Sequence, residues 1–250
     1  MRRLLTLSAL SLLLASPARA DALTDLRAAL EALRGSAPLA ASATIRIAST
    51  TEDDDVERKE EGEVTVDIED GSGGLSIRYP KALLDRLERE AKATRADPEK
   101  TAPARSAVRE IDSILASSLL NHAPALLGRL EAAELVEQKS VALDGAPARL
   151  LVFRVTPRMS ASAKKRIKSA EVLLRVWAGP DGLPRAAELT EKIHAKILIM
   201  SFHHDGKSSW TFERASDRLL VRSYRDENSD RGFGQNSRRT VEVKLTPSTP

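Results

Sequence analysis

The feature that most constrains the fold is a two-residue alternation of apolar and polar side chains through the C-terminal half of the chain. It is clearest where Val241, Val243 and Leu245 alternate with polar neighbours. Successive side chains of a strand point to opposite faces of its sheet, so this period predicts strands with one buried face. Hairpin turns are expected at three Asp-Gly pairs, which begin at Asp144, Asp181 and Asp205.

The alternation predicts a β-meander over about residues 140–246. Its strands are expected at 148–156, 171–178, 185–193, 196–204, 208–214, 218–225 and 238–246. Three more strands are expected near the N-terminus, the first two separated by an acidic loop and the last preceded by the glycine-rich turn at 70–74. So many strands in one chain favour a single large curved antiparallel sheet, a half-barrel-like meander, over two separate domains.

Helical spacing occurs in two places, and both segments are expected to cover the sheet. Leucines at positions 23, 26, 30 and 33 share one face of an N-terminal helix, which Gly35 and Pro38 end. From about residue 80 to 139 the apolar residues again have helical spacing, which predicts a helical insertion. Within it, residues 91–106 have no apolar period and are expected to be a mobile connector. The expected fold class is therefore α+β.

The first twenty residues are typical of a secretory signal peptide that is cut after Ala20. Arg2 and Arg3 precede an apolar stretch from Leu4 to Ala15, which is short of the ~20 residues that span a bilayer. We therefore expect residues 1–20 to be removed and residues 21–250 to form one domain in the periplasm or outside the cell. No transmembrane segment is expected after cleavage.

Composition narrows the function classes. The absence of cysteine excludes disulfides, thiolate nucleophiles and cysteine-based zinc sites. The chain has 39 basic and 36 acidic residues, but Arg2, Arg3 and Arg19 leave with the signal peptide, so the mature chain is formally neutral. We therefore expect no nucleic-acid partner.

The remaining charge is distributed unevenly along the chain. Residues 52–70 are rich in acids, whereas residues 151–170 contain no acid at all. Solvated loops are one interpretation of such segments. The other is a basic surface for phospholipid headgroups or an acidic protein partner, formed by Arg154, Arg158, Lys164, Lys165, Arg166 and Lys168.

Motifs for catalysis and cofactor binding are missing from the sequence. It contains no nucleophile elbow, zinc-protease helix, phosphate-binding loop or dinucleotide fingerprint. We therefore assign no catalytic residue, no metal ligand and no cofactor, and we expect no enzyme. The remaining catalytic hypothesis is a hydrolase in which His194 and His203 meet across paired strands beside Asp205. Surface or turn histidines are the alternative interpretation.

Two of the predicted strands are apolar on both faces, and a strand of this kind must be covered on both. One face then packs on helices, and the other closes over a cavity or over an ordinary filled core, because the two give the same pattern. The cavity hypothesis assigns the ligand-lining role to Val172, Leu174, Val176, Leu198, Met200 and Phe212. An acyl chain buried there would be stabilised by ~0.8 kcal/mol per methylene.

Two segments resemble a known family in their order of elements. Asp21–Leu33, followed by Ala43–Ala48, is similar to the helix and first strand of the lipoprotein-localisation (LolA/LolB-like) superfamily of periplasmic proteins. Trp177–Pro184 is similar to that family's strand, turn and proline-started next strand. The resemblance covers most of the mature chain. It implies an open β half-barrel closed by helices around a hydrophobic cavity that receives acyl chains, and it assigns no binding residue.

The sequence thus predicts an exported, non-catalytic protein that binds a hydrophobic or lipid-like ligand in a cavity of a β half-barrel. The alternative is a periplasmic protein-interaction or regulatory module with a filled core and charged docking loops.

Overall fold

The computed structural model describes residues 17–53, 56–157, 160, 165–197, 200–232 and 234–248. The strands in this part of the chain are β1 (Leu39–Asp53), β2 (Val56–Gly71), β3 (Gly74–Arg78), β4 (Ala133–Leu143), β5 (Ala146–Val155), β6 (Ile167–Ala178), β7 (Pro184–Ile197), β8 (Met200–Ala215), β9 (Arg218–Gly232) and β10 (Gln235–Pro247). The helices are α1 (Pro17–Glu31), α2 (Lys81–Ala96), α3 (Pro103–Val108), α4 (Ser113–Leu120) and α5 (Ala123–Leu130).

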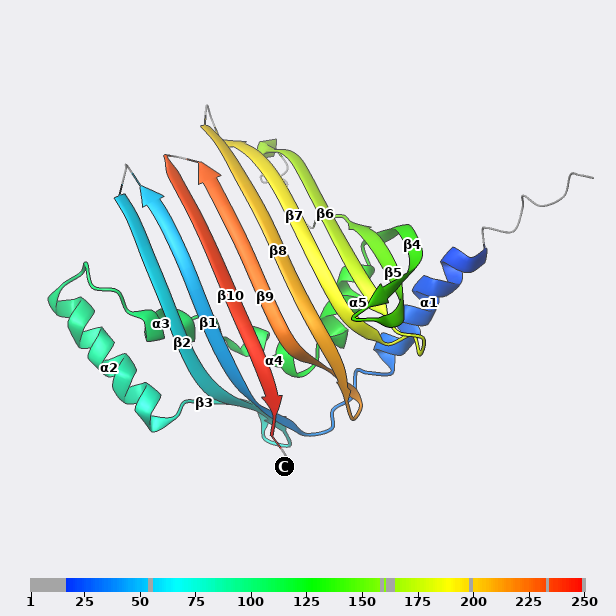
Figure 1. Cartoon of the computed structure of the whole chain (residues 1–250), viewed down its shortest axis with the longest axis horizontal. Coiled ribbons are helices and arrows are strands. Elements are labelled where there is room, and N and C mark those ends of the chain that lie inside the picture. Colours follow the sequence, from blue (N-terminus) through cyan, green and yellow to red (C-terminus); the bar gives the residue numbers. More distant parts are fainter. Residues whose placement is uncertain are drawn as a thin grey trace, which may run out of the picture.

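The strands form one antiparallel sheet in the order β3-β2-β1-β10-β9-β8-β7-β6-β5-β4. The sheet is curved but not closed into a barrel, which confirms the α+β class expected from the sequence (Figure 1). β1–β3 and β4–β10 are each meanders, and they are joined where β1 pairs with β10, with Ile45 opposite Val243. The helical insertion connects β3 to β4, which are the two edge strands.

The helices cover one face of the sheet. Along the insertion, α3 contacts β1 and β2, α4 contacts β9, and α5 contacts β4 and β5, so the chain crosses this face from one edge to the other (Figure 1). α1 packs on α5 and β4 through the predicted leucine face, of which Leu26, Leu30 and Leu33 are fully buried. α1 begins at Pro17 and so includes the expected cleavage position, whereas residues 1–16 lie outside the described part.

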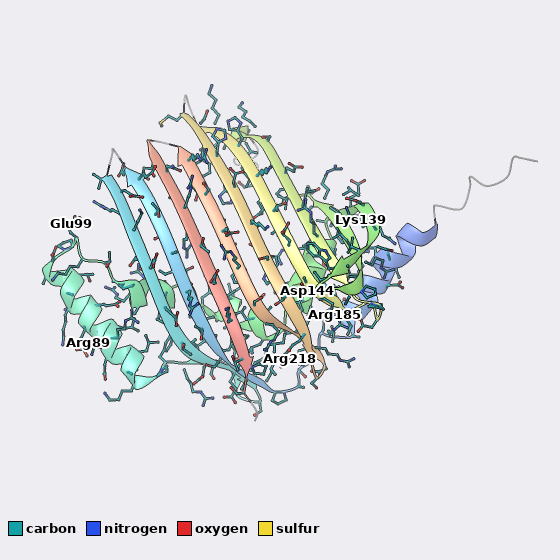
Figure 2. All side chains as sticks on the ribbon, viewed as in Figure 1. Arg89, Glu99, Lys139, Asp144, Arg185 and Arg218 are labelled. Atoms are coloured by element: carbon teal, nitrogen blue, oxygen red, sulfur yellow. The ribbon has the colours of Figure 1, made fainter. Side chains whose placement is uncertain are left out.

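A single hydrophobic core fills the space between the sheet and the helices. The strand side contributes alternate residues such as Ile45, Val66 and Leu174, and the helix side contributes Leu119 and Leu126. The opposite face is polar, and oxygen and nitrogen atoms follow its strands in Figure 2. None of the helices in the described residues is long and apolar enough to cross a membrane.

Two predicted strand boundaries are wrong. One error divides a single strand and the other misses a strand, so the expected number of strands is unchanged. The Asp205-Gly206 pair lies inside β8, so the strands expected at 196–204 and 208–214 divide differently: β7 ends at Ile197 and β8 is one long strand. β4 begins at Ala133, so the helical insertion ends at Leu130 and not near residue 139.

The acidic loop expected after Glu52 is also largely strand. β1 and β2 pair continuously from Leu39 opposite Asp70 to Asp53 opposite Val56. The sequence has three consecutive aspartates at 53–55 in this region; Asp53 ends β1, and residues 54 and 55 lie outside the described part. The acidic side chains of β2 are therefore held at fixed positions along a strand.

The mobile connector expected at 91–106 is mostly helix. α2 continues to Ala96, and α3 is fixed by two carboxylates from elsewhere in the chain. Glu90 accepts from the backbone N–H groups of Ala104 and Arg105 at 3.1 and 3.0 Å, and Glu60 of β2 accepts from the Ser106 hydroxyl at 3.0 Å. The free edge of β2 is thereby covered, which removes a template for edge-to-edge aggregation.

Substitution at Gly62 tests this edge contact. A Cβ at Gly62 would lie 2.2 Å from the carbonyl oxygen of Pro103, so α3 must move to admit any side chain. We expect Gly62→Ala to lower the free energy of unfolding by about 1–3 kcal/mol, the usual range for overpacking. Urea unfolding measures this change. Gly73→Ala is the matched control, because nothing lies within 4 Å of its Cβ position; equal effects of the two substitutions would contradict the prediction.

Candidate functional site

A pocket of about 330 Å³ opens between α4, α5 and the strands β8–β10. Its walls combine apolar, aromatic, polar and charged side chains. The lining residues are Glu110, Asp112, Ile114, Leu115, Ser118, His122, Arg129, Trp210, Tyr224, Asp226 and Val241. The volume is at the lower end of the range of ~300–1,000 Å³ that is usual for small-molecule sites. The pocket therefore has room for a small ligand or for one end of a longer one.

The centre of the pocket is an aromatic cluster. The His122 ring lies 5.1 Å from the Trp210 ring and 5.4 Å from Phe212, and Trp210 stacks on Tyr224 at 5.6 Å, all between ring centroids. The Arg129 guanidinium lies over Trp210, with Cζ 5.2 Å from the ring centroid, which is a cation-π geometry. The cluster thus joins the α4–α5 segment to the middle of the sheet.

The fold positions His122 through backbone contacts. His122 connects α4 to α5, and its backbone N–H donates to the carbonyl of Leu219 at 2.8 Å. Asn121 Oδ1 accepts from the N–H of Leu219 at 3.3 Å and from that of Ala123 at 3.2 Å. These bonds tie the turn between the helices to the start of β9 and hold the imidazole over the sheet.

His122 is an uncharged side chain at neutral pH. It is only 2% exposed, and burial, together with the nearby charge of Arg129, lowers its pKa to about 3. Nδ1 lies 2.8 Å from the Ser118 hydroxyl, whereas Nε2 has no hydrogen-bond partner among the described residues. Ser118 and His122 have the spacing of a nucleophile and its base, but so low a pKa makes His122 a poor base at neutral pH.

Arg129 is the least compensated charge of the pocket. Its Nη1 atom is buried and has no hydrogen-bond partner in the described part of the chain, and the side chain makes no ion pair there. Burial lowers the pKa of Arg129 below its usual value, while Glu191 and Tyr224 oppose part of that shift. An arginine nevertheless stays protonated in proteins, so the pocket contains a cation with an unused hydrogen-bond donor.

Tyr224 and its polar neighbours complete the wall opposite the helices. Burial and the charge of Asp226 raise the pKa of Tyr224 to about 12, so its hydroxyl stays protonated. Asp226 accepts from the Ser208 hydroxyl at 2.6 Å and from Asn228 Nδ2 at 2.5 Å, and is therefore already hydrogen-bonded. The carboxylate of Asp226 is thus occupied by protein donors, whereas Nη1 of Arg129 has no acceptor within the described residues.

The residues predicted to line a ligand cavity are not assembled into this pocket. Val172, Leu174, Val176 and Phe212 are buried in the hydrophobic core, and Phe212 meets the pocket only by contacting His122. Met200 is 43% exposed at the start of β8. Leu198 lies outside the described residues.

The predicted basic surface divides into two regions. Arg154 is exposed on β5 and faces Glu134 of β4 at 3.7 Å. Lys165, Arg166 and Lys168 are exposed where β6 begins. Arg158 and Lys164 lie outside the described residues.

The histidine pair proposed from the sequence does form. His194 and His203 are opposite each other on β7 and β8, with ring centroids 4.3 Å apart and nearly parallel rings. Within the described ranges, however, no three imidazole or carboxylate side chains are grouped so that they could hold a metal ion. His204 points to the other face and pairs with Asp230 at 2.7 Å.

No family model matches the sequence, and no curated protein matches it significantly. The resemblance to the lipoprotein-localisation superfamily therefore stays a prediction.

Proposed function

We propose that this chain is an exported, non-catalytic protein of the periplasm or extracellular space that binds a lipid-like ligand with an acidic headgroup. The headgroup would lie beside Arg129, and the adjoining apolar part would contact the wall formed by Ile114, Leu115 and Trp210. The observation that carries the proposal is that the buried Nη1 atom of Arg129, a residue that lines the pocket, has no hydrogen-bond partner among the described residues.

The physical argument is one of charge compensation. Removing an ion from water without a partner costs several kcal/mol, so a fold that keeps such a cation gains when an anion arrives. A hydrogen bond to a charged group contributes about 1.5–3 kcal/mol. Because His122 is uncharged, Arg129 is the cation that selects for a negative headgroup, and Nε2 of His122 adds a second unpartnered polar atom nearby.

The apolar wall supplies the second part of the argument. Ile114 of α4 helps to line the pocket, and it is 79% exposed. Each ligand methylene buried against this wall would contribute ~0.8 kcal/mol. An isolated inorganic anion would leave this apolar surface in water. An amphipathic ligand would contact both Arg129 and the apolar wall, and it therefore fits the site better. The open half-barrel architecture agrees with the acyl-chain binding that the family resemblance implies.

Arg129→Met tests the headgroup contact, because methionine keeps an unbranched apolar stem and loses the charged guanidinium. We expect the wild-type protein to bind a fluorescent long-chain fatty acid more tightly than its methyl ester, and the variant to lose about tenfold to a hundredfold in affinity for the acid alone. Fluorescence titration measures both ligands.

Arg89→Met is the matched control, since Arg89 is exposed on α2 (Figure 2), a helix that contributes no residue to the pocket wall. It removes the same charge and should leave both affinities unchanged. Equal binding of acid and ester by the wild-type protein, or equal losses in the two variants, would rule out a headgroup contact at Arg129.

A further inference from the structure

The ends of β6, β7 and β9, together with the residues just before β6, carry a cluster of exposed cations at one end of the sheet. We call this cluster the basic rim; it consists of Lys165, Arg166, Lys168, Lys196 and Arg231. The strand register brings these residues together, because Ile167 is opposite Ala195, Lys196 is opposite Ser201, and His203 is opposite Arg231. The strand ends concerned lie side by side along the upper edge of the sheet in Figure 1.

The basic rim has no counter-charge of its own. Residues 165–170, 193–204 and 231–239 contain no acid. None of the five cations makes an ion pair within the described part of the chain, whereas cations elsewhere on the same sheet do, such as Arg46 with Glu63 and Arg225 with Glu242. Like charges held close together repel one another, so the rim favours an anionic partner from outside the molecule.

An exposed apolar side chain lies within the same cluster. Met200 begins β8 opposite Ile197, next to the pair formed by Lys196 and Ser201, and 43% of its surface is exposed. Cations that surround an apolar side chain suit the boundary between lipid headgroups and acyl chains, where the cations meet phosphates and the apolar group inserts.

We propose that the basic rim docks the protein onto the surface of an anionic phospholipid bilayer. Lysines are depleted in protein–protein interfaces, whereas each lysine or arginine close to an anionic leaflet strengthens binding; three of the five rim cations are lysines. This proposal goes beyond ligand binding at Arg129 and stands on residues outside that pocket.

Co-sedimentation with vesicles tests the proposal. The purified protein should sediment with vesicles of equal parts phosphatidylcholine and phosphatidylglycerol, and not with vesicles of phosphatidylcholine alone. Each removed cation should weaken this partition by about fivefold. The triple variant Lys165→Gln, Lys168→Gln, Lys196→Gln should therefore bind about a hundredfold more weakly, and salt should weaken the wild-type protein in the same direction.

The matched control removes three lysines at the far side of the molecule, in Lys81→Gln, Lys92→Gln, Lys100→Gln. It should bind vesicles like the wild-type protein. The triple rim variant should still bind the fluorescent fatty acid like the wild-type protein, because none of its three lysines lines the pocket, and this separates vesicle docking from ligand binding at Arg129. All variants share one N-terminus, so any contribution of residues 1–16 cancels. The proposal is overturned if the wild-type protein ignores anionic vesicles, binds neutral ones equally, or loses as much binding in the control. Capture of duplex DNA without capture of vesicles also overturns it.

Discussion

A Leu174→Asp variant is expected not to fold. Leu174 is fully buried on β6, with Phe153 and Leu189 opposite it on the two neighbouring strands. Truncating a buried leucine alone costs about 2–5 kcal/mol, and an unpaired buried carboxylate adds several more. The sum is comparable to the entire stability of a typical domain, about 5–15 kcal/mol. Circular dichroism and a urea titration on the purified variant measure the loss.

Met200→Asp is the informative partner of that substitution, since the sequence assigned both residues to one ligand cavity. Met200 is 43% exposed, so the change should alter the free energy of unfolding by about 0.5 kcal/mol or less. If Leu174→Asp instead folded normally and only failed to capture a fatty acid, Leu174 would line a cavity and the packed core described for β6 would be refuted.

The free energy of unfolding is expected to decrease as the pH is lowered from about 6.5 to about 4.5, because of His122. Its pKa is lowered to about 3 in the folded state, against a usual value of about 6.5 in the unfolded chain. Below about pH 6.5 the unfolded state therefore takes up a proton that the folded state does not. The free energy of unfolding then falls by about 1.4 kcal/mol per pH unit, or roughly 2–3 kcal/mol across this interval.

Urea titrations at several pH values measure that slope, and His122→Gln should remove most of it. Hydrogen bonds lower the pKa of two carboxyl groups, Glu88 with Lys92 and Glu227 with Arg225. Their contribution to the stability of the protein is lost only at still lower pH. They therefore do not account for the change above pH 4.5. A slope that survives unchanged in His122→Gln would show that the buried imidazole is not its origin.

The period-two pattern was sufficient to predict an antiparallel sheet, but local signals misplaced parts of it. Asp205-Gly206 has the composition of a hairpin turn, yet Gly206 lies in the middle of β8. A Cβ there would come within 2.9 Å of His204 Nε2 and 3.1 Å of Asn228 Oδ1, so the glycine serves a close approach of side chains. Turn composition and strand crowding favour the same residue, and the sequence does not separate the two causes.

β4 escaped prediction for a different reason. Its register shifts between Leu135 and Glu137, which leaves Val136 as the extra residue of a bulge. The bulge reverses the phase of the alternation within one strand, and most side chains of this edge strand are only partly buried. The apolar residues therefore appeared to continue the helical spacing of α5.

The pocket was beyond the reach of sequence patterns. His122 and Arg129 come from the helical insertion, whereas Trp210 and Tyr224 come from a hairpin about eighty residues further on. Their meeting depends on how the insertion crosses the sheet, and no spacing within either segment encodes that crossing. A lone histidine and arginine in an apolar helical stretch were the only local signals, and both fit an ordinary surface as well.

The helical insertion joins the two edge strands of an unclosed sheet, and this connection acts as a mechanical constraint. The residues between β3 and β4 cross the helix-covered face of the sheet from one edge to the other. The sheet therefore cannot flatten or close without a change in the packing of α3, α4 and α5. The pocket lies beneath part of that span. A ligand that lifts α4 would therefore pull on both edges at once, and the curvature of the whole sheet would respond to occupancy of a single small site.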